Sequence, residues 1–221
     1  MEFTRQEIND IILSTLSIAC TLIVSNLFLN LAWIGKFFMA AIIVSASLII
    51  KLFIQKRVAE KYDCEIKYAF DYSLFIVGIL IAFASQGSII FAVMGGITAS
   101  SAFVSRLGHK YVNITQRERG LINLSGPMAN IVLALISLLL YPLSNDFFQL
   151  MLNVNIYMAL FALIPIPPLD GSKVFWWNRL VWLISFIIAL FMFFMARTVL
   201  FSIIGIILLV IVTFVLWEKM F

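Results

Sequence analysis

The chain has 221 residues, of which 63% are hydrophobic and only 12% are charged, and its formal net charge is +4. A water-soluble domain usually carries about 25% charged residues, so this composition excludes a soluble fold. The sequence has no interleaved basic and aromatic residues of the kind that binds nucleic acid, so we expect no nucleic-acid partner. We therefore expect one integral-membrane domain over residues 1–221, embedded in the lipid bilayer of the cell membrane.

Long apolar runs separated by short polar segments predict an all-α polytopic membrane protein with about six transmembrane helices. The first run, Ile11 to Ile34, is long enough to span with some tilt, and no basic signal-peptide segment precedes it. The second run, Phe37 to Ile54, ends in a polar segment with four basic residues: Lys56, Arg57, Lys61 and Lys67. Basic residues mark the cytoplasmic side, so we expect a multi-pass protein whose N-terminus and residues 55–72 are cytoplasmic.

The third run, Ser73 to Gly96, is interrupted by the polar stretch Ser85 to Ser88. Basic residues flank it on both sides. A single span would place one basic flank outside, whereas a re-entrant pair of helices breaking at this stretch keeps both flanks inside. We favour the re-entrant interpretation and expect a re-entrant or extended segment near residues 85–119, with short extended pieces and turns up to Gly120.

Four further spans follow, at about Leu121 to Leu143, Phe147 to Ile164, Leu180 to Met195 and Thr198 to Leu216. Between the second and third of these, a proline-rich turn holds Asp170, which Gly171 follows. An ionisable residue near membrane depth is costly, and it indicates a functional site by default. The alternative is a solvated loop acid that caps the next helix.

Two motifs resemble the site-2 protease family of intramembrane zinc metalloproteases. LIPIPPLDG, which contains Asp170, is similar to the family element whose Asp-Gly pair supplies a zinc carboxylate. SGPMAN, Ser125 to Asn130, is similar to the element that places an Asn near the active site. NRLVWL after the LDG segment also matches archaeal members. The resemblance covers about residues 45–185 and implies a site-2 protease-like core over about residues 37–185.

The family's HExxH motif is absent. In this motif two His residues on one helix face bind zinc, and the Glu is the general base. The segment KRVAEKYDCE resembles the basic helix end that follows the motif in archaeal members. Counting back from it puts Lys51-Leu52-Phe53-Ile54-Gln55 in place of HExxH, with Lys51 and Gln55 at the His positions and Leu52 at the general-base position.

The resemblance therefore implies a relict site made of Lys51, Gln55, Asn130 and Asp170. Asp170 is the only retained ligand position, so we expect no metal, no cofactor and no catalytic residue; zinc is expected only if the family activity survives. Lys51 either pairs with Asp170 or extends to the cytoplasmic interface. Asn130 either lies near the site, as in active relatives, or hydrogen-bonds between helices.

Three functions remain open. We favour a catalytically inactive site-2 protease-like protein that binds or regulates a transmembrane partner. In active relatives a strand from the region of Gly95 and Gly96 is expected to pair with an unwound substrate, and such binding does not need the metal. The alternatives are an active intramembrane zinc metalloprotease with an atypical site and an unrelated membrane transporter or scaffold.

Overall fold

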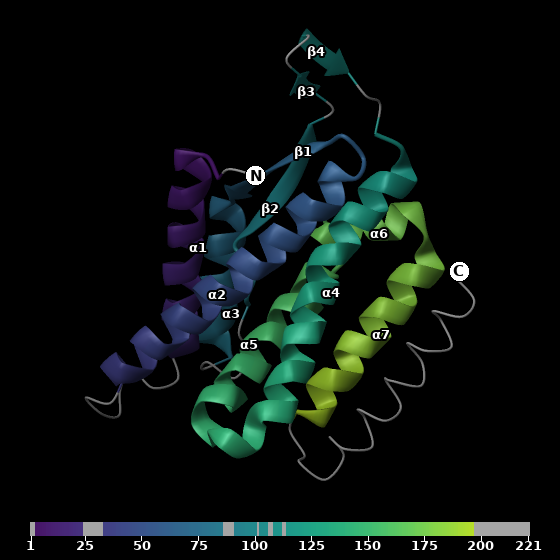
Figure 1. Ribbon diagram of the computed structural model, residues 1–221. Coiled ribbons are helices and arrows are strands. Elements are labelled where there is room, and N and C mark those ends of the chain that lie inside the picture. Colours follow the sequence, from purple (N-terminus) through teal and green to yellow (C-terminus); the bar gives the residue numbers. More distant parts are fainter. Residues whose placement is uncertain are drawn as a thin grey trace.

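The computed structural model describes residues 3–23, 33–85, 91–100, 102–105, 108–111 and 114–196. Within these residues the chain forms seven α-helices, four short strands and one short 3₁₀ helix (Figure 1). The helices are α1 (Arg5–Ile23), α2 (Trp33–Glu60), α3 (Tyr72–Ala84), α4 (Gln116–Leu140), α5 (Asn145–Ala162), α6 (Asp170–Trp177) and α7 (Arg179–Met195), and η2 is Tyr141–Leu143. The strands are β1 (Glu65–Phe70), β2 (Gly95–Ser100), β3 (Ala102–Ser105) and β4 (Gly108–Tyr111).

Helix α2 is central to the arrangement because it packs against α1 on one side and α4 on the other. Figure 1 shows α4, α5, α6 and α7 together on one side of the molecule, with α1 on the far side of α2. One apolar core lies among α1, α2 and β1, and it includes Ile18 and Leu52. A second lies among α4, α5 and α7 and includes Ala134, Ala159 and Met192. Helix α2 therefore lies between the two groups of helices, and its side chains can contact both.

Local sequence signals begin several helices. Thr115 and Glu118 form a reciprocal capping box at the start of α4, each side chain accepting a backbone N–H of the other residue. The Asp71 side chain accepts the amides of Ser73 and Leu74 at the start of α3. These caps satisfy backbone donors that have no partner inside the helix.

Strands β1 and β2 form an antiparallel pair in which Glu65 lies opposite Ser100 and Phe70 lies opposite Gly95. Strands β3 and β4 form a separate antiparallel pair, which Figure 1 shows beyond the helices at the same end of the molecule. The short extended pieces expected before Gly120 are therefore present. Strand β1 was not expected, because residues 55–72 were interpreted only as a basic segment. Its sequence EIKYAF does begin with alternating charged and apolar residues, and burial follows that alternation.

Two of the described helices are long and apolar enough to cross a membrane, at 34–60 and 116–143. The expected number of about six is not supported: the apolar helices at 72–84, 146–162 and 179–195 are shorter than the roughly 20 residues of a typical span. The third run does not form one span, because its helix ends at Ala84 and β2 begins at Gly95. The expected last span, 198–216, lies outside the described residues.

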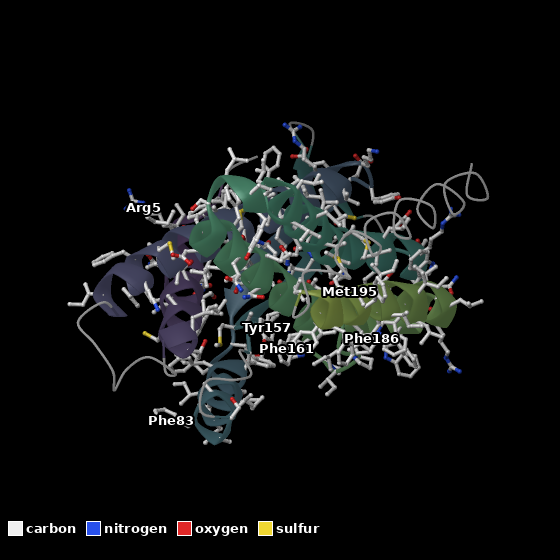
Figure 2. The ribbon with its side chains drawn as sticks, turned by 90° about the horizontal axis from the view of Figure 1, so that it is seen from below. Arg5, Phe83, Tyr157, Phe161, Phe186 and Met195 are labelled. Atoms are coloured by element: carbon white, nitrogen blue, oxygen red, sulfur yellow. The ribbon has the colours of Figure 1, made fainter. Side chains whose placement is uncertain are left out.

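Large apolar side chains are exposed along several helices. Phe38 and Ile42 on α2 are 62% and 64% exposed, and Leu139 on α4 is 64% exposed. Figure 2 shows Phe83, which is 63% exposed, on the outer end of α3, while Tyr157 and Phe161 lie inside, where their rings stack 6.2 Å apart. Exposed large apolar side chains on several helices are consistent with a lipid environment.

Candidate functional site

Asp170, on α6, lies at the centre of a buried polar cluster with two side chains of α2. The Lys51 ammonium on α2 lies 2.9 Å from Oδ2 of Asp170, and both side chains are at least 95% buried. Nε2 of Gln55, one turn further along α2, donates to the same oxygen at 3.3 Å. The pairing of Lys51 with Asp170 is thus present, and the alternative in which Lys51 extends to the interface is wrong.

The turn between α5 and α6 holds Asp170 in this position. Trp182 on α7 donates from Nε1 to the Leu163 carbonyl at 2.7 Å, which fixes the end of α5. Gly171 packs directly on that end, because a Cβ at this position would meet the Leu163 carbonyl and would lie 2.7 Å from the Ile164 oxygen. Asp170 itself is the first residue of α6, and the N-cap position belongs to Leu169. Asp170 therefore faces the cluster and does not act as a helix cap.

Gly126 on α4 lets α2 approach closely at the same level. A Cβ on Gly126 would meet the amide of Gln55 and would lie 2.8 Å from Cε of Lys51. The glycine of the SGPMAN motif is therefore a packing requirement of the cluster. Sequence reasoning singled out Asn130 and did not identify this role, although the Gly-Pro pair was a signal for it.

Several polar atoms of the cluster, and of the α4 face that packs on α2, are unpaired. Oδ1 of Asp170, Oε1 of Gln55 and both side-chain heteroatoms of Asn130 are buried and have no hydrogen-bond partner. Asn130 is fully buried and lies one helical turn after Gly126, so it shares the α4 face that approaches α2. Burying such atoms without partners costs free energy, so their presence needs an explanation, of which a functional site is one.

The residues of this cluster do not fit a catalytic zinc ion. Such a site usually takes three protein ligands and a water molecule. Here one carboxylate oxygen of Asp170 already accepts from an ammonium and an amide NH₂, and neither Lys51 nor Gln55 is a usual zinc ligand. Within the described part of the chain, no three His, Cys, Asp or Glu side chains gather to hold a metal. Leu52 is 1% exposed within the first apolar core and carries no group that could act as a base.

A second buried ion pair lies near the end of α2. Lys56 contacts both Glu7 oxygens, at 3.0 Å and 3.1 Å. The Glu7 carboxylate also accepts the Thr4 amide at 2.9 Å and the Tyr68 amide of β1 at 3.2 Å. Burial alone would raise the pKa of Glu7, but these donors and the Lys56 charge together lower it below its usual value. This pair joins α1, α2 and β1, and no local sequence pattern indicated it.

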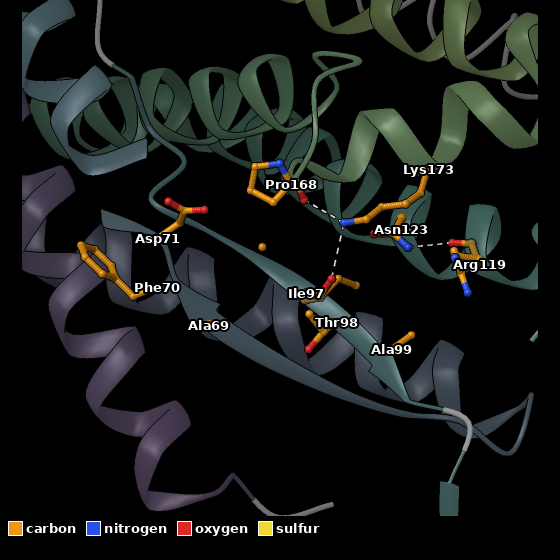
Figure 3. A pocket seen from close by; sticks show the side chains of 11 residues that line it. Ala69, Phe70, Asp71, Ile97, Thr98, Ala99, Arg119, Asn123, Pro168 and Lys173 are labelled. Carbon is orange, nitrogen blue, oxygen red and sulfur yellow. Dashed lines mark hydrogen bonds between the residues drawn. The ribbon is translucent and has the colours of Figure 1, made fainter. Parts of the chain in front are cut away.

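A cleft of about 430 Å³ lies beside the Asp170 cluster, between β2 and the start of α6 (Figure 3). Its lining includes Ile97, Ala99, Arg119, Asn123, Pro168 and Lys173. Lys173 donates to the Pro168 carbonyl at 2.7 Å and to the Ile97 carbonyl at 3.4 Å. Burial lowers the pKa of Lys173; the Asp170 charge opposes that shift, whereas Lys51 and Arg119 add to it.

A comparison with curated proteins finds a similar chain in Methanocaldococcus jannaschii, whose name assigns it provisionally as a zinc metalloprotease. The two are 26% identical over 188 residues, which cover 82% of this chain and 90% of the relative. This likeness suggests a metalloprotease-like protein. No family model matches the chain, and no solved structure matches it.

Proposed function

We propose that this chain is a site-2 protease-like membrane protein that no longer binds zinc and that binds a transmembrane partner without cleaving it. The observation that carries the proposal is the convergence of Lys51 and Gln55 on Asp170. By the resemblance, those two residues take the His positions of the family motif, and Asp170 takes its carboxylate position. The ammonium places a positive charge beside the carboxylate, where the resemblance implies a metal ion.

The proposal includes a multi-pass topology with the N-terminus and residues 55–72 in the cytoplasm. It is supported by the exposed apolar surface of the helices and by the exposed basic residues that follow α2. If α2 crosses the membrane once, Lys36 and Lys61 lie on opposite sides. A cysteine replacing Lys61, in a background lacking Cys20 and Cys64, should react with an impermeant maleimide only after permeabilisation, whereas one replacing Lys36 should react in intact cells. The reverse pattern would overturn the orientation.

Metal analysis of the purified full-length chain tests the loss of zinc. We expect the natural chain to carry no stoichiometric zinc. The double variant Lys51→His/Gln55→His provides two imidazoles on one helix face beside Asp170, so it should bind about one zinc per chain. The matched control adds Asp170→Ala to the double variant and should lose that metal.

Two results would contradict the proposal. Stoichiometric zinc in the natural chain, lost in Asp170→Ala, would favour the alternative that the name of the relative supports, an active zinc metalloprotease. Absence of zinc in the folded double-His variant would show that the cluster does not have the shape of a metal site.

The partner segment, in this proposal, is extended and adds to the outer edge of β2. This is supported by the cleft beside that edge and by its position next to the Asp170 cluster. Backbone hydrogen bonds to a strand edge give affinity without a metal, so loss of catalysis does not abolish this kind of binding.

A further inference from the structure

The register of β1 and β2 determines which backbone groups of β2 are free. The Tyr68 amide donates to Glu7 and not to its cross-strand neighbour Ile97. Tyr68 and Ile97 are therefore a non-hydrogen-bonded pair of the antiparallel ladder. The N–H and C=O of each residue point away from the partner strand, toward the outer edge of its own strand. The groups of Ile97 and, two residues on, of Ala99 therefore form the outer edge of β2. No further strand pairs with this edge in the part of the chain that the structure describes.

Both edges of this small sheet are covered by a charged side chain at the same residue pair. The Glu7 carboxylate accepts from Tyr68 on the β1 side, and the Lys173 ammonium donates to Ile97 on the β2 side. Charged side chains at strand edges block pairing with other strands. The β1 cap belongs to a closed network with Lys56 and Thr4, whereas the β2 cap is one side of an open cleft.

The contact between Lys173 and β2 is weaker than its contact with the turn. Its ammonium lies 2.7 Å from the Pro168 carbonyl but 3.4 Å from the Ile97 carbonyl (Figure 3). An ammonium has three donors, and a four-carbon stem lets it move. The Ile97 carbonyl can thus be released while Lys173 keeps its bond to the turn.

We propose that Lys173 is an exchangeable cap on the outer edge of β2, and that the segment replacing it carries an acidic side chain. This inference rests on the proposed binding of an extended partner segment at this edge. An incoming strand needs the Ile97 carbonyl as an acceptor, so Lys173 must give it up. A carboxylate on the strand then supplies the ammonium with a new acceptor.

The other polar groups of the cleft favour a peptide carboxylate. Arg119 is exposed at the same end of the cleft as Lys173, and Asp71 lies at the opposite end (Figure 3). Oδ1 of Asn123, a residue only 1% exposed, has no partner and can accept an N–H. A peptide offers both a carboxylate and N–H donors, whereas a fully ionised phosphate group offers acceptors alone.

Binding of two short fluorescent peptides to the purified full chain in detergent micelles tests the cap. Both are extended, Val- and Thr-rich sequences, identical except for one central Glu or Gln. We expect the natural chain to prefer the Glu peptide about tenfold, the effect of about one charge-assisted hydrogen bond. Lys173→Met should bind the Gln peptide more tightly than the natural chain does, because the edge is free, and should lose most of the preference for Glu.

Three control variants locate the effect. Lys173→Arg should keep the Glu preference. Arg119→Gln should weaken that preference without improving binding of the Gln peptide, since the cap is still present. Ala99→Pro removes an outward-facing N–H and blocks the edge without removing a ladder bond to β1, so it should abolish binding of both peptides.

The possible results of these binding measurements distinguish failure of the Lys173 cap from failure of the proposed partner binding. Equal binding of each peptide by the natural chain and by folded Lys173→Met, lost in Ala99→Pro, would overturn the cap and leave the binding function standing. A failure of both peptides to bind either protein would overturn the proposed partner binding, and the cap with it. Peptide binding that survives Ala99→Pro would show a site elsewhere and would overturn both.

Discussion

Helix α2 carries two buried lysines, and the two ion pairs that they form differ in how completely their carboxylates are bonded. Both oxygens of Glu7 have donors, from Lys56, Thr4 and Tyr68. Asp170 uses one oxygen for both Lys51 and Gln55, and its other oxygen has no partner. Two buried lysine–carboxylate pairs thus differ: the Glu7 pair forms a closed network, and the Asp170 pair forms an incomplete cluster. The closed network gives a donor to each carboxylate oxygen of Glu7, whereas the incomplete cluster keeps one buried oxygen of Asp170 without a donor.

The largest expected effect comes from removing one lysine of each pair. Lys51→Met leaves the Asp170 carboxylate buried beside a single amide donor, so we expect the free energy of unfolding to fall by about 3–5 kcal/mol. Lys56→Met should cost less, about 1–3 kcal/mol, because Glu7 keeps its backbone donors. Equilibrium unfolding in mixed micelles measures both. The double variant Lys51→Met/Asp170→Leu removes both charges and should recover most of the loss.

Equal losses for the two lysine variants would break the comparison, because they would show that the unpaired oxygen of Asp170 makes no difference. A failure of the double variant to recover stability would mean that Lys51 contributes through its packing and not through its charge.

The next effect concerns the close packing of α4 on the Asp170 cluster. Gly126→Ala would push a methyl group against Gln55 and Cε of Lys51, and we expect it to cost about 1–3 kcal/mol. Gly35→Ala is the matched control, because no atom lies within 4 Å of the added Cβ on α2. That change should stabilise the helix by about 0.5–1 kcal/mol. Thermal unfolding of the two variants distinguishes packing at the cluster from helix propensity; two changes of the same sign would contradict the close approach.

The smallest effect is a pH dependence at the closed pair. The pKa of Glu7 is lower in the folded chain than the ordinary value of about 4.3. The stability that its charge contributes is therefore complete above that value and is lost as the pH falls through the lowered pKa. The difference in stability between the natural chain and Glu7→Gln should be largest near neutral pH and should shrink below about pH 4. If the stability difference between the two proteins grew on acidification, the pKa of Glu7 would be raised by folding and not lowered.

Motif spacing predicted much of the Asp170 cluster but little of its surroundings. Counting back from the basic end of α2 placed Lys51 and Gln55 on one helix face, and the proline-rich turn placed Asp170; the structure brings these three together. That they are the relict of a metal site stays a prediction. Glu7 was missed because its partners lie far along the chain. Lys173 was missed because a lysine in a short helix carries no pattern of its own.

The sequence by itself determined the apolar character of the chain, most helix positions, the extended segment before α4 and the identity of the residues beside Asp170. The apolar character, the helix positions and the extended segment follow from composition and local spacing, which act over a few residues. The residues beside Asp170 were implied by the resemblance of their motifs to the site-2 protease family. Only the tertiary structure decided that β1 pairs with β2, that Asp170 lacks one partner and that two charged side chains cover the sheet edges. Strand partners, unpaired atoms and caps depend on groups that are distant in sequence, and their contacts are set by how whole helices pack against one another.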